Sequence, residues 1–116
     1  MQILIADDDE VARMVLEDSL QSAGHQVVAA SNGREALQLF ERREYDLVIT
    51  DKVMPEMNGD QLAVAVKSRE PETRVIMLTG FGALPDAEHQ SEFIDLVLTK
   101  PTSLAELRAA IAKVMG

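Results

Sequence analysis

The chain has 116 residues, of which 47% are apolar and only 3% aromatic, so it is long enough for one domain with an aliphatic core. Eleven basic against 20 acidic residues give a net charge of −9, which disfavours direct contact with nucleic acid or with an anionic membrane surface. The sequence contains no cysteine, which excludes disulfides, thiolate metal sites and cysteine nucleophiles.

No apolar run approaches the ~18 residues that a membrane-spanning helix needs. The N-terminus is not basic and then apolar, as a signal peptide would be, because acidic residues begin at Asp7. We therefore expect one domain over residues 1–116, located in the cytoplasm.

Short apolar runs alternate with amphipathic stretches along the chain. Five runs that are too short for helices are predicted to be strands: Gln2–Ala6, 27–30, 47–50, 75–78 and 96–98. Four stretches carry apolar residues at helical spacing: one that stops at Gly24, one that follows Ser31-Asn32-Gly33, one that Pro71 closes, and one that Ser103 and Glu106 open as a capping box. A weaker, polar helix candidate covers residues 86–93.

The strand-like runs are continuously apolar, as expected for parallel strands buried on both faces. Right-handed crossovers then predict an α/β fold with a doubly wound five-stranded parallel sheet, order 2-1-3-4-5, and about five helices on its two sides, as in flavodoxin-like proteins. Ligands of such sheets bind beyond the carboxyl ends of the strands, so candidate functional residues are sought there.

Polar side chains follow four of the five predicted strands: Asp7 and Asp8, Asp51, Thr79 and Lys100. Clustered carboxylates are the ligands that Mg²⁺ prefers, and Mn²⁺ accepts the same donors. Without a cation, each close pair of carboxylates repels by ~1 to 4 kcal/mol, depending on the screening. Lys100 would supply one compensating charge and a divalent metal two.

Each of these residues also has an ordinary structural interpretation. Asp8 or Asp9 could cap the first helix, and Asp51 could open a turn. Thr79 could simply end a strand, and Lys100 could be solvated. Because all four strand ends carry a group that a phosphoryl–metal site needs, we favour a site.

Five motifs stand in order along the chain: ILIADDD (residues 3–9), LVITD (47–51), MPEMNG (54–59), IMLTG (76–80) and LTKP (98–101). Together they resemble the receiver domain of two-component response regulators, the CheY-like family, over essentially the whole chain. Two features depart from the family pattern. Val97 stands where receivers often carry an aromatic residue, and residues 83–92 are polar and contain Pro85.

The resemblance implies roles for the residues at the strand ends. Asp51 would be the phosphoacceptor, Asp8 would bind Mg²⁺ directly, and Asp7 would act largely through water. The backbone carbonyl of Val53 would be a further metal ligand. Thr79 and Lys100 would contact phosphoryl oxygens, whereas Asp9 is better explained as a helix cap.

The leading functional prediction is a signalling switch of a phosphorelay and not an enzyme, since it would catalyse only its own phosphoryl transfer and dephosphorylation. Its phosphodonor would be a histidine of a sensor kinase or a phosphotransfer protein. One alternative is a receiver-like module that binds partners without phosphorylation. Another is an aspartyl phosphatase of the haloacid-dehalogenase type, which needs a second acid where Val53 stands and a larger, capped chain. A flavin carrier is disfavoured, because residues 7–9 would repel its phosphate.

Overall fold

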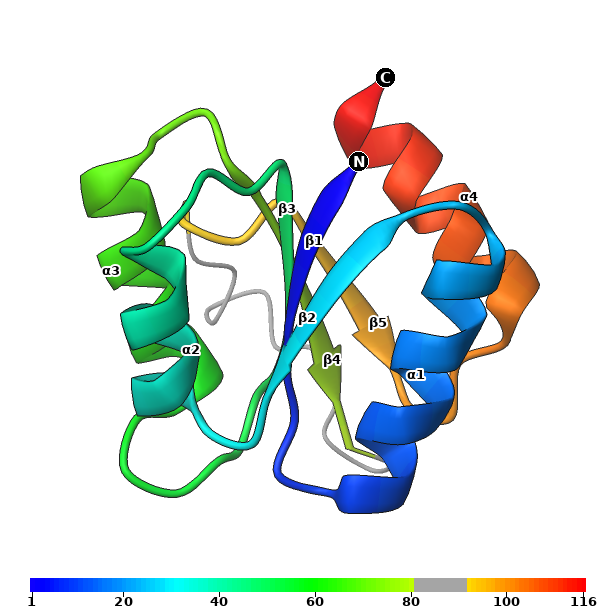
Figure 1. Ribbon diagram of the computed structural model, residues 1–116, viewed down its shortest axis with the longest axis horizontal. Helices are drawn as coiled ribbons and strands as arrows, with labels where there is room; N and C mark the ends of the chain where they lie inside the picture. Colours follow the sequence, from blue (N-terminus) through cyan, green and yellow to red (C-terminus); the bar gives the residue numbers. More distant parts are fainter. Residues whose placement is uncertain (81–91) are drawn as a thin grey trace.

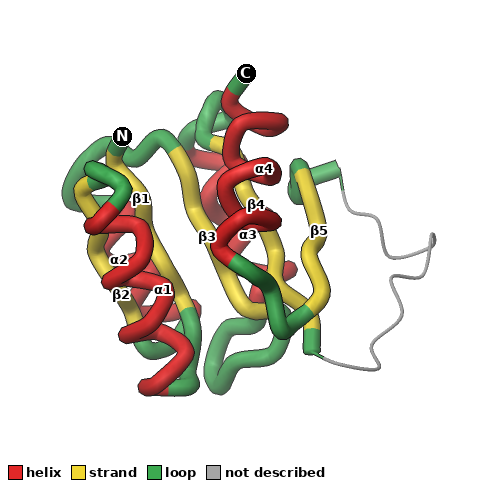
Figure 2. Tube along the Cα trace, turned by 90° about the vertical axis from the view of Figure 1, so that its right-hand side faces the viewer, coloured by secondary structure: helices red, strands yellow, loops and turns green. Residues whose placement is uncertain are grey.

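One parallel sheet organises the protein, and the computed structural model describes residues 1–80 and 92–116. The strands are β1 (Gln2–Ala6), β2 (Gln26–Ala30), β3 (Leu47–Asp51), β4 (Arg74–Thr79) and β5 (Leu96–Thr99). They lie in the order β2-β1-β3-β4-β5 (Figure 2). All neighbouring strands are parallel. The helices of the described part are α1 (Glu10–Ser22), α2 (Gly33–Phe40), α3 (Gly59–Arg69) and α4 (Leu104–Met115).

The helices form two outer layers. α2 and α3 cover one face of the sheet, and α1 and α4 cover the other (Figure 1). Alternate residues of a strand point to opposite faces. In β1, Leu4 packs in the core beneath α2 and α3, whereas Ile3 and Ile5 pack in the core beneath α1 and α4. Both faces are therefore buried, which is why the strands read as continuous apolar runs.

The predicted strand order and α/β fold are confirmed. Four strands, all except β1, extend past the predicted apolar runs onto polar residues. The ladder includes these residues, since it pairs Gln2 with Gln26, Leu47 with Arg74, Asp51 with Leu78, and Thr79 with Thr99. The helix expected over residues 86–93 lies largely outside the described residues, and Glu92 lies in a turn. Within the described part, no helix is long and apolar enough to cross a membrane.

Polar caps define where the helices begin. The Asp9 carboxylate accepts hydrogen bonds from the Val11 and Ala12 amides, which confirms Asp9 as the cap of α1. Gly24 follows that helix with φ +95°, a conformation that favours glycine. At α4 the Ser103 hydroxyl accepts the Glu106 amide as predicted, but the Glu106 carboxylate accepts the Ser103 hydroxyl proton.

α3 carries a complete reciprocal capping box that was not predicted from the sequence. The Asn58 side chain accepts the Gln61 amide, and the Gln61 side chain accepts the Asn58 amide. This box fixes the start of α3 directly after the loop that leaves β3. The loop is therefore held at both ends, next to the carboxyl edge of the sheet.

Candidate functional site

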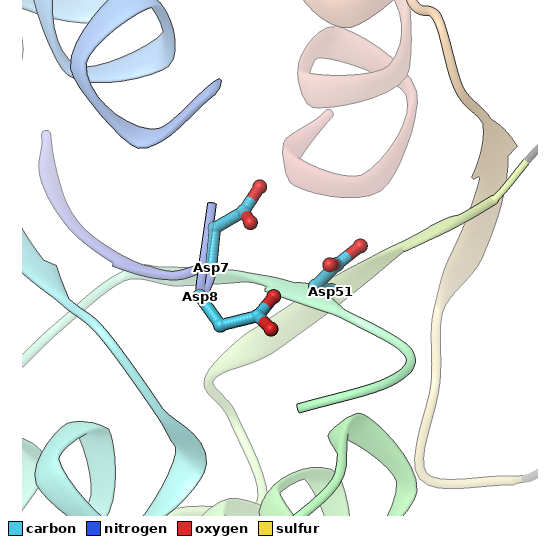
Figure 3. A group of neighbouring side chains, drawn as sticks. All are labelled: Asp7, Asp8 and Asp51. Carbon is cyan, nitrogen blue, oxygen red and sulfur yellow. The ribbon is translucent and has the colours of Figure 1, made fainter. Parts of the chain in front are cut away.

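Three aspartates meet at the carboxyl edge of the two central strands. Asp7 follows β1, Asp8 comes next, and Asp51 ends β3; β1 and β3 are neighbours whose last paired residues are Ala6 and Thr50. One carboxylate oxygen from each aspartate lies within 4.8 Å of the others (Figure 3). Asp7 is 1% exposed, whereas Asp8 is exposed to solvent. The convergence predicted for the three carboxylates is thus present in the structure.

The Lys100 ammonium lies between two of these carboxylates. Its Nζ is 2.9 Å from Asp51 Oδ1 and 3.0 Å from Asp7 Oδ2. The backbone amide of Lys100 donates to the Thr79 carbonyl at 2.7 Å, which extends the contact between β4 and β5 by one residue. Lys100 is therefore an ion-paired residue of the site, and the interpretation of it as a merely solvated lysine is wrong.

The electrostatics of the site disfavour the negative charge on Asp51. Burial raises the pKa of Asp51 above its ordinary value, the hydrogen bond from Lys100 opposes this rise, and the charges of Asp7 and Asp8 add to it. For Lys100, burial works to lower the pKa, but the hydrogen bonds to Asp51 and Asp7 outweigh it and raise the pKa. The two shifts have different causes: burial dominates at Asp51, whereas the contacts with Asp51 and Asp7 dominate at Lys100.

Thr79 lies at the same edge but its hydroxyl is engaged elsewhere. The residue is 3% exposed, and its Oγ1 donates to the Leu98 carbonyl of β5 at 3.5 Å, a long hydrogen bond. Val53, two residues beyond Asp51, has a side chain that is 76% exposed. At Gly80, an added Cβ would meet no described atom within 4 Å, so there is space beside the end of β4.

Backbone contacts that sequence reasoning missed hold the aspartates in place. The Thr50 hydroxyl donates to the Asp51 carbonyl at 3.0 Å. Gly59, the first residue of α3, approaches that same carbonyl so closely that a Cβ would collide with it. An Arg13 guanidinium nitrogen donates to the Asp7 carbonyl at 2.9 Å. In the sequence, only the position of Arg13 could have pointed to this contact, since it is a basic residue about one helical turn beyond the acidic residues 7–10.

A groove of about 440 Å³ opens next to the site, between α1 and the segment that leads from β5 into α4. Asp7 and Lys100 are among its lining residues, and most of the others are apolar, including Val15 and Leu104. Val15 and Leu104 also belong to the large apolar side chains that are exposed to solvent. The site thus borders an apolar surface.

The site can bind a hard divalent cation. Its donors are carboxylate oxygens, which Mg²⁺ and Mn²⁺ accept together with water. The three carboxylates and Lys100 leave a net local charge of −3 + 1 = −2 when all are ionised. A dication cancels this charge, and it would make the approach of an anionic group to Asp51 possible.

Comparisons with known proteins agree on one family of signalling domains. A family model described as the response regulator receiver domain matches residues 3–112. The chain is 34% identical to the response regulator receiver protein CpdR of Brucella abortus, covering 98% of this chain and 96% of that protein. It is 38% identical to the transcriptional regulatory protein GlrR of Escherichia coli, but spans only 25% of its length.

Solved structures agree. A receiver domain protein from Clostridium thermocellum superposes with a TM-score of 0.89 at 32% identity, covering 98% of this chain and 93% of that one. The response regulator TrrA of Thermotoga maritima, solved in complex with Mg²⁺ and BeF, superposes with a TM-score of 0.83 at 30% identity, covering 97% of each chain.

Proposed function

This chain belongs to the response regulator receiver domain family, and on that premise we propose that it is a phosphorylation-dependent signalling switch in which Asp51 accepts a phosphoryl group from a histidine of a partner protein. One observation carries the proposal: the Lys100 ammonium is held between Asp51 and Asp7 at the edge where three carboxylates meet. The protein catalyses its own phosphoryl transfer and dephosphorylation, and residues 1–116 form the receiver domain.

The transfer follows from the charges at the site. An Asp51 carboxylate oxygen forms a bond to the phosphorus, the phosphorus–nitrogen bond to the donor histidine breaks, and its electron pair stays on the imidazole. Charge on both partners must be neutralised for two anions to react. The Lys100 ammonium, already in contact with Asp51, offsets charge on the transferred oxygens. The Thr79 hydroxyl exchanges its long bond to Leu98 for a phosphoryl oxygen.

The metal that fits this site is Mg²⁺, with Mn²⁺ as a substitute. Asp8 and Asp51 would bind it directly, the backbone carbonyl of Val53 would add a third protein ligand, and Asp7 would act largely through water. The fit rests on the three carboxylate oxygens within 4.8 Å of one another. Bound there, the metal supplies positive charge to the incoming phosphoryl oxygens.

The phosphodonor is a sensor histidine kinase or a histidine phosphotransfer protein. One relative, the LuxN autoinducer 1 sensor kinase/phosphatase of Vibrio campbellii, is 33% identical, and the chain spans 12% of its length. The apolar groove beside Lys100 supports a protein as the donor, because it offers contact area next to the acceptor. No direct nucleic-acid or membrane contact is proposed, in keeping with the net charge of −9.

The acceptor is tested with a small-molecule phosphodonor, Mg²⁺ and intact-mass measurement. We expect the wild type to gain one phosphoryl group that hydroxylamine removes, as it does from an acyl phosphate, and Asp51→Asn to gain none. Asp18→Asn, which removes an exposed aspartate of α1, is the matched control and should react as the wild type does. Unchanged phosphorylation of Asp51→Asn would place the acceptor elsewhere. A wild type that never reacts would favour a module that binds partners without phosphorylation.

The metal site is tested by thermal unfolding with and without Mg²⁺. A ligand that binds only the folded state raises the melting temperature by mass action, so Mg²⁺ should stabilise the wild type. Asp8→Ala should abolish this rise, whereas Asp18→Ala should keep it. A full Mg²⁺-dependent rise in Asp8→Ala would contradict the assignment of Asp8 as a ligand.

A further inference from the structure

The turn between β1 and α1 holds Asp8 from both sides without touching its carboxylate. On one side, the Asp7 carbonyl accepts a hydrogen bond from Arg13 at 2.9 Å. On the other side, the Asp9 amide donates to Asp7 Oδ1 at 2.9 Å. The Asp8 carboxylate itself has no hydrogen-bond partner within the part of the chain that the structure describes. Its place therefore depends on the peptide groups that flank it.

Arg13 is well placed to hold that turn rigidly. It lies in the first turns of α1, where its backbone amide donates to the Asp9 carbonyl at 2.9 Å, and its side chain is half-buried. The guanidinium then reaches back to the carbonyl of Asp7, the residue that directly follows β1. One side chain thus ties the start of the helix to the end of the strand, with Asp8 between the two contacts.

We propose that Arg13 is a positioning residue of the divalent-cation site, which orients the Asp8 carboxylate by holding the peptide between Asp7 and Asp8. The inference rests on the proposed metal site of Asp7, Asp8 and Asp51. Partners that orient metal ligands in this way affect metal affinity by about 10–100-fold. The guanidinium suits the task because its planar donors fix a direction as well as a distance.

The positive charge of Arg13 should weaken Mg²⁺ binding, whereas its positioning of Asp8 should strengthen it. The direction in which Mg²⁺ affinity changes when Arg13 is removed therefore tests the proposal. A positive side chain near a dication weakens binding of that dication by repulsion. Removing Arg13 therefore tightens Mg²⁺ binding if the charge matters most, and weakens it if the positioning of Asp8 matters most. The structure favours positioning, because the guanidinium is committed to a backbone carbonyl of the turn itself.

The experiment is a calorimetric Mg²⁺ titration of the wild type, Arg13→Met, Arg13→Lys and Arg42→Met. Arg42 is exposed after α2, away from the aspartates, so its variant controls for the loss of one positive charge. We expect Arg13→Met to raise the Mg²⁺ Kd by about tenfold. Arg13→Lys should also raise it, since an ammonium lacks the planar fork, and Arg42→Met should leave it unchanged or slightly lower.

A second measurement separates positioning from general loss of structure. At saturating Mg²⁺, Arg13→Met should be phosphorylated by a small-molecule donor at nearly the wild-type rate, while the Mg²⁺ concentration for half the maximal rate rises about tenfold. If Arg13→Met does not fold, Arg13→Lys is measured in its place. An Arg13 variant whose Kd for Mg²⁺ is unchanged or lower overturns the proposed role of Arg13 but does not contradict the proposed function. A wild type without Mg²⁺ affinity overturns both.

Discussion

Asp51 occupies an environment that disfavours its charge, and this has a consequence for stability. Burial and the neighbouring aspartates raise its pKa despite the contact with Lys100. The folded state therefore binds a proton more tightly than the unfolded state. The contribution of Asp51 to stability must then fall as the pH rises from its unfolded pKa through its folded pKa.

We accordingly expect Asp51→Asn to raise the melting temperature at neutral pH without Mg²⁺. Asparagine has nearly the same shape but no charge, so the loss of stability with rising pH disappears from the variant. The gain should shrink as the pH falls below the ordinary range of an aspartate, where Asp51 is protonated in both states. Thermal unfolding from acid to neutral pH, with Asp18→Asn as control, measures this difference. A variant that is less stable than the wild type at neutral pH contradicts it.

Removing the charge of Lys100 should lower stability, whereas removing the charge of Asp51 should raise it. The reason is that Lys100 is the cation that pairs with Asp7 and Asp51. Removing one partner of a buried pair costs about 3–5 kcal/mol, and the 27% exposure of the Lys100 side chain reduces the expected loss to roughly 1–3 kcal/mol. We expect Lys100→Met to unfold at a lower temperature in chelator.

Mg²⁺ should then stabilise Lys100→Met more than it stabilises the wild type, since the dication replaces the missing charge. Lys113→Met, which removes an exposed lysine of α4, should behave as the wild type. Thermal unfolding across a Mg²⁺ series distinguishes the outcomes. An equal Mg²⁺ response in both proteins would show that Lys100 does not compensate the carboxylates.

The first residue of α3 packs against the end of β3 and so helps to fix the position of Asp51. Gly59 lies against the Asp51 carbonyl, and an added Cβ would also come within 3.0 Å of the Met77 methyl group and 3.1 Å of the Lys52 Cα. Two of these three neighbours are backbone atoms, which cannot turn aside. The capping box of Asn58 and Gln61 prevents the helix from simply starting elsewhere.

Gly59→Ala should therefore displace α3 from the edge of the sheet and lower stability by about 1–3 kcal/mol, the usual cost of overpacking. Val64→Ala, on the exposed side of the same helix, should cost much less. Denaturant unfolding of the two variants gives the comparison. The finding that Gly59→Ala is as stable as Val64→Ala would mean that the β3–α3 contact is not tight.

At the scale of the whole molecule, the proposed function requires that a change at Asp51 be transmitted to a surface that a partner contacts. In related receivers an aromatic residue of β5 contributes, but here that position is Val97, a stiff β-branched residue with little surface to rearrange. Among the described residues, the Thr79 hydroxyl donates to a carbonyl of β5 and takes no part in the backbone ladder between β4 and β5. A movement of this hydroxyl therefore leaves the ladder in place.

We expect hydrogen exchange on binding of beryllofluoride with Mg²⁺ to change most in residues 80–93, most of which lie outside the described residues, and much less around Val97. The sequence of that segment contains glycine and polar residues and few apolar residues. Exchange followed by mass spectrometry tests this pattern, with Asp51→Asn as the unresponsive control. Large changes in exchange at β5 and none in residues 80–93 would contradict this prediction and show that the response passes through β5.

Periodicity in the sequence was sufficient to predict the fold. Continuous apolar runs and helical stripes are local features, and the topological rules for parallel sheets are general, so the sequence alone predicts the observed strand order. The same rules bring the ends of neighbouring strands together, which is why Asp7, Asp8 and Asp51 could be placed at one edge. Asp9 as a helix cap also followed, because capping is a local interaction.

Only the tertiary structure decided how these side chains pair. Lys100 and Asp7 are 93 residues apart in the chain, and nothing local specifies that one ammonium contacts both Asp7 and Asp51. The raised pKa of Asp51 arises from burial and from the charges of Asp7 and Asp8 in the turn after β1. The reach of Arg13 to the Asp7 carbonyl depends on the angle between β1 and α1. Such properties depend on distance and desolvation in three dimensions, which spacing along the chain does not contain.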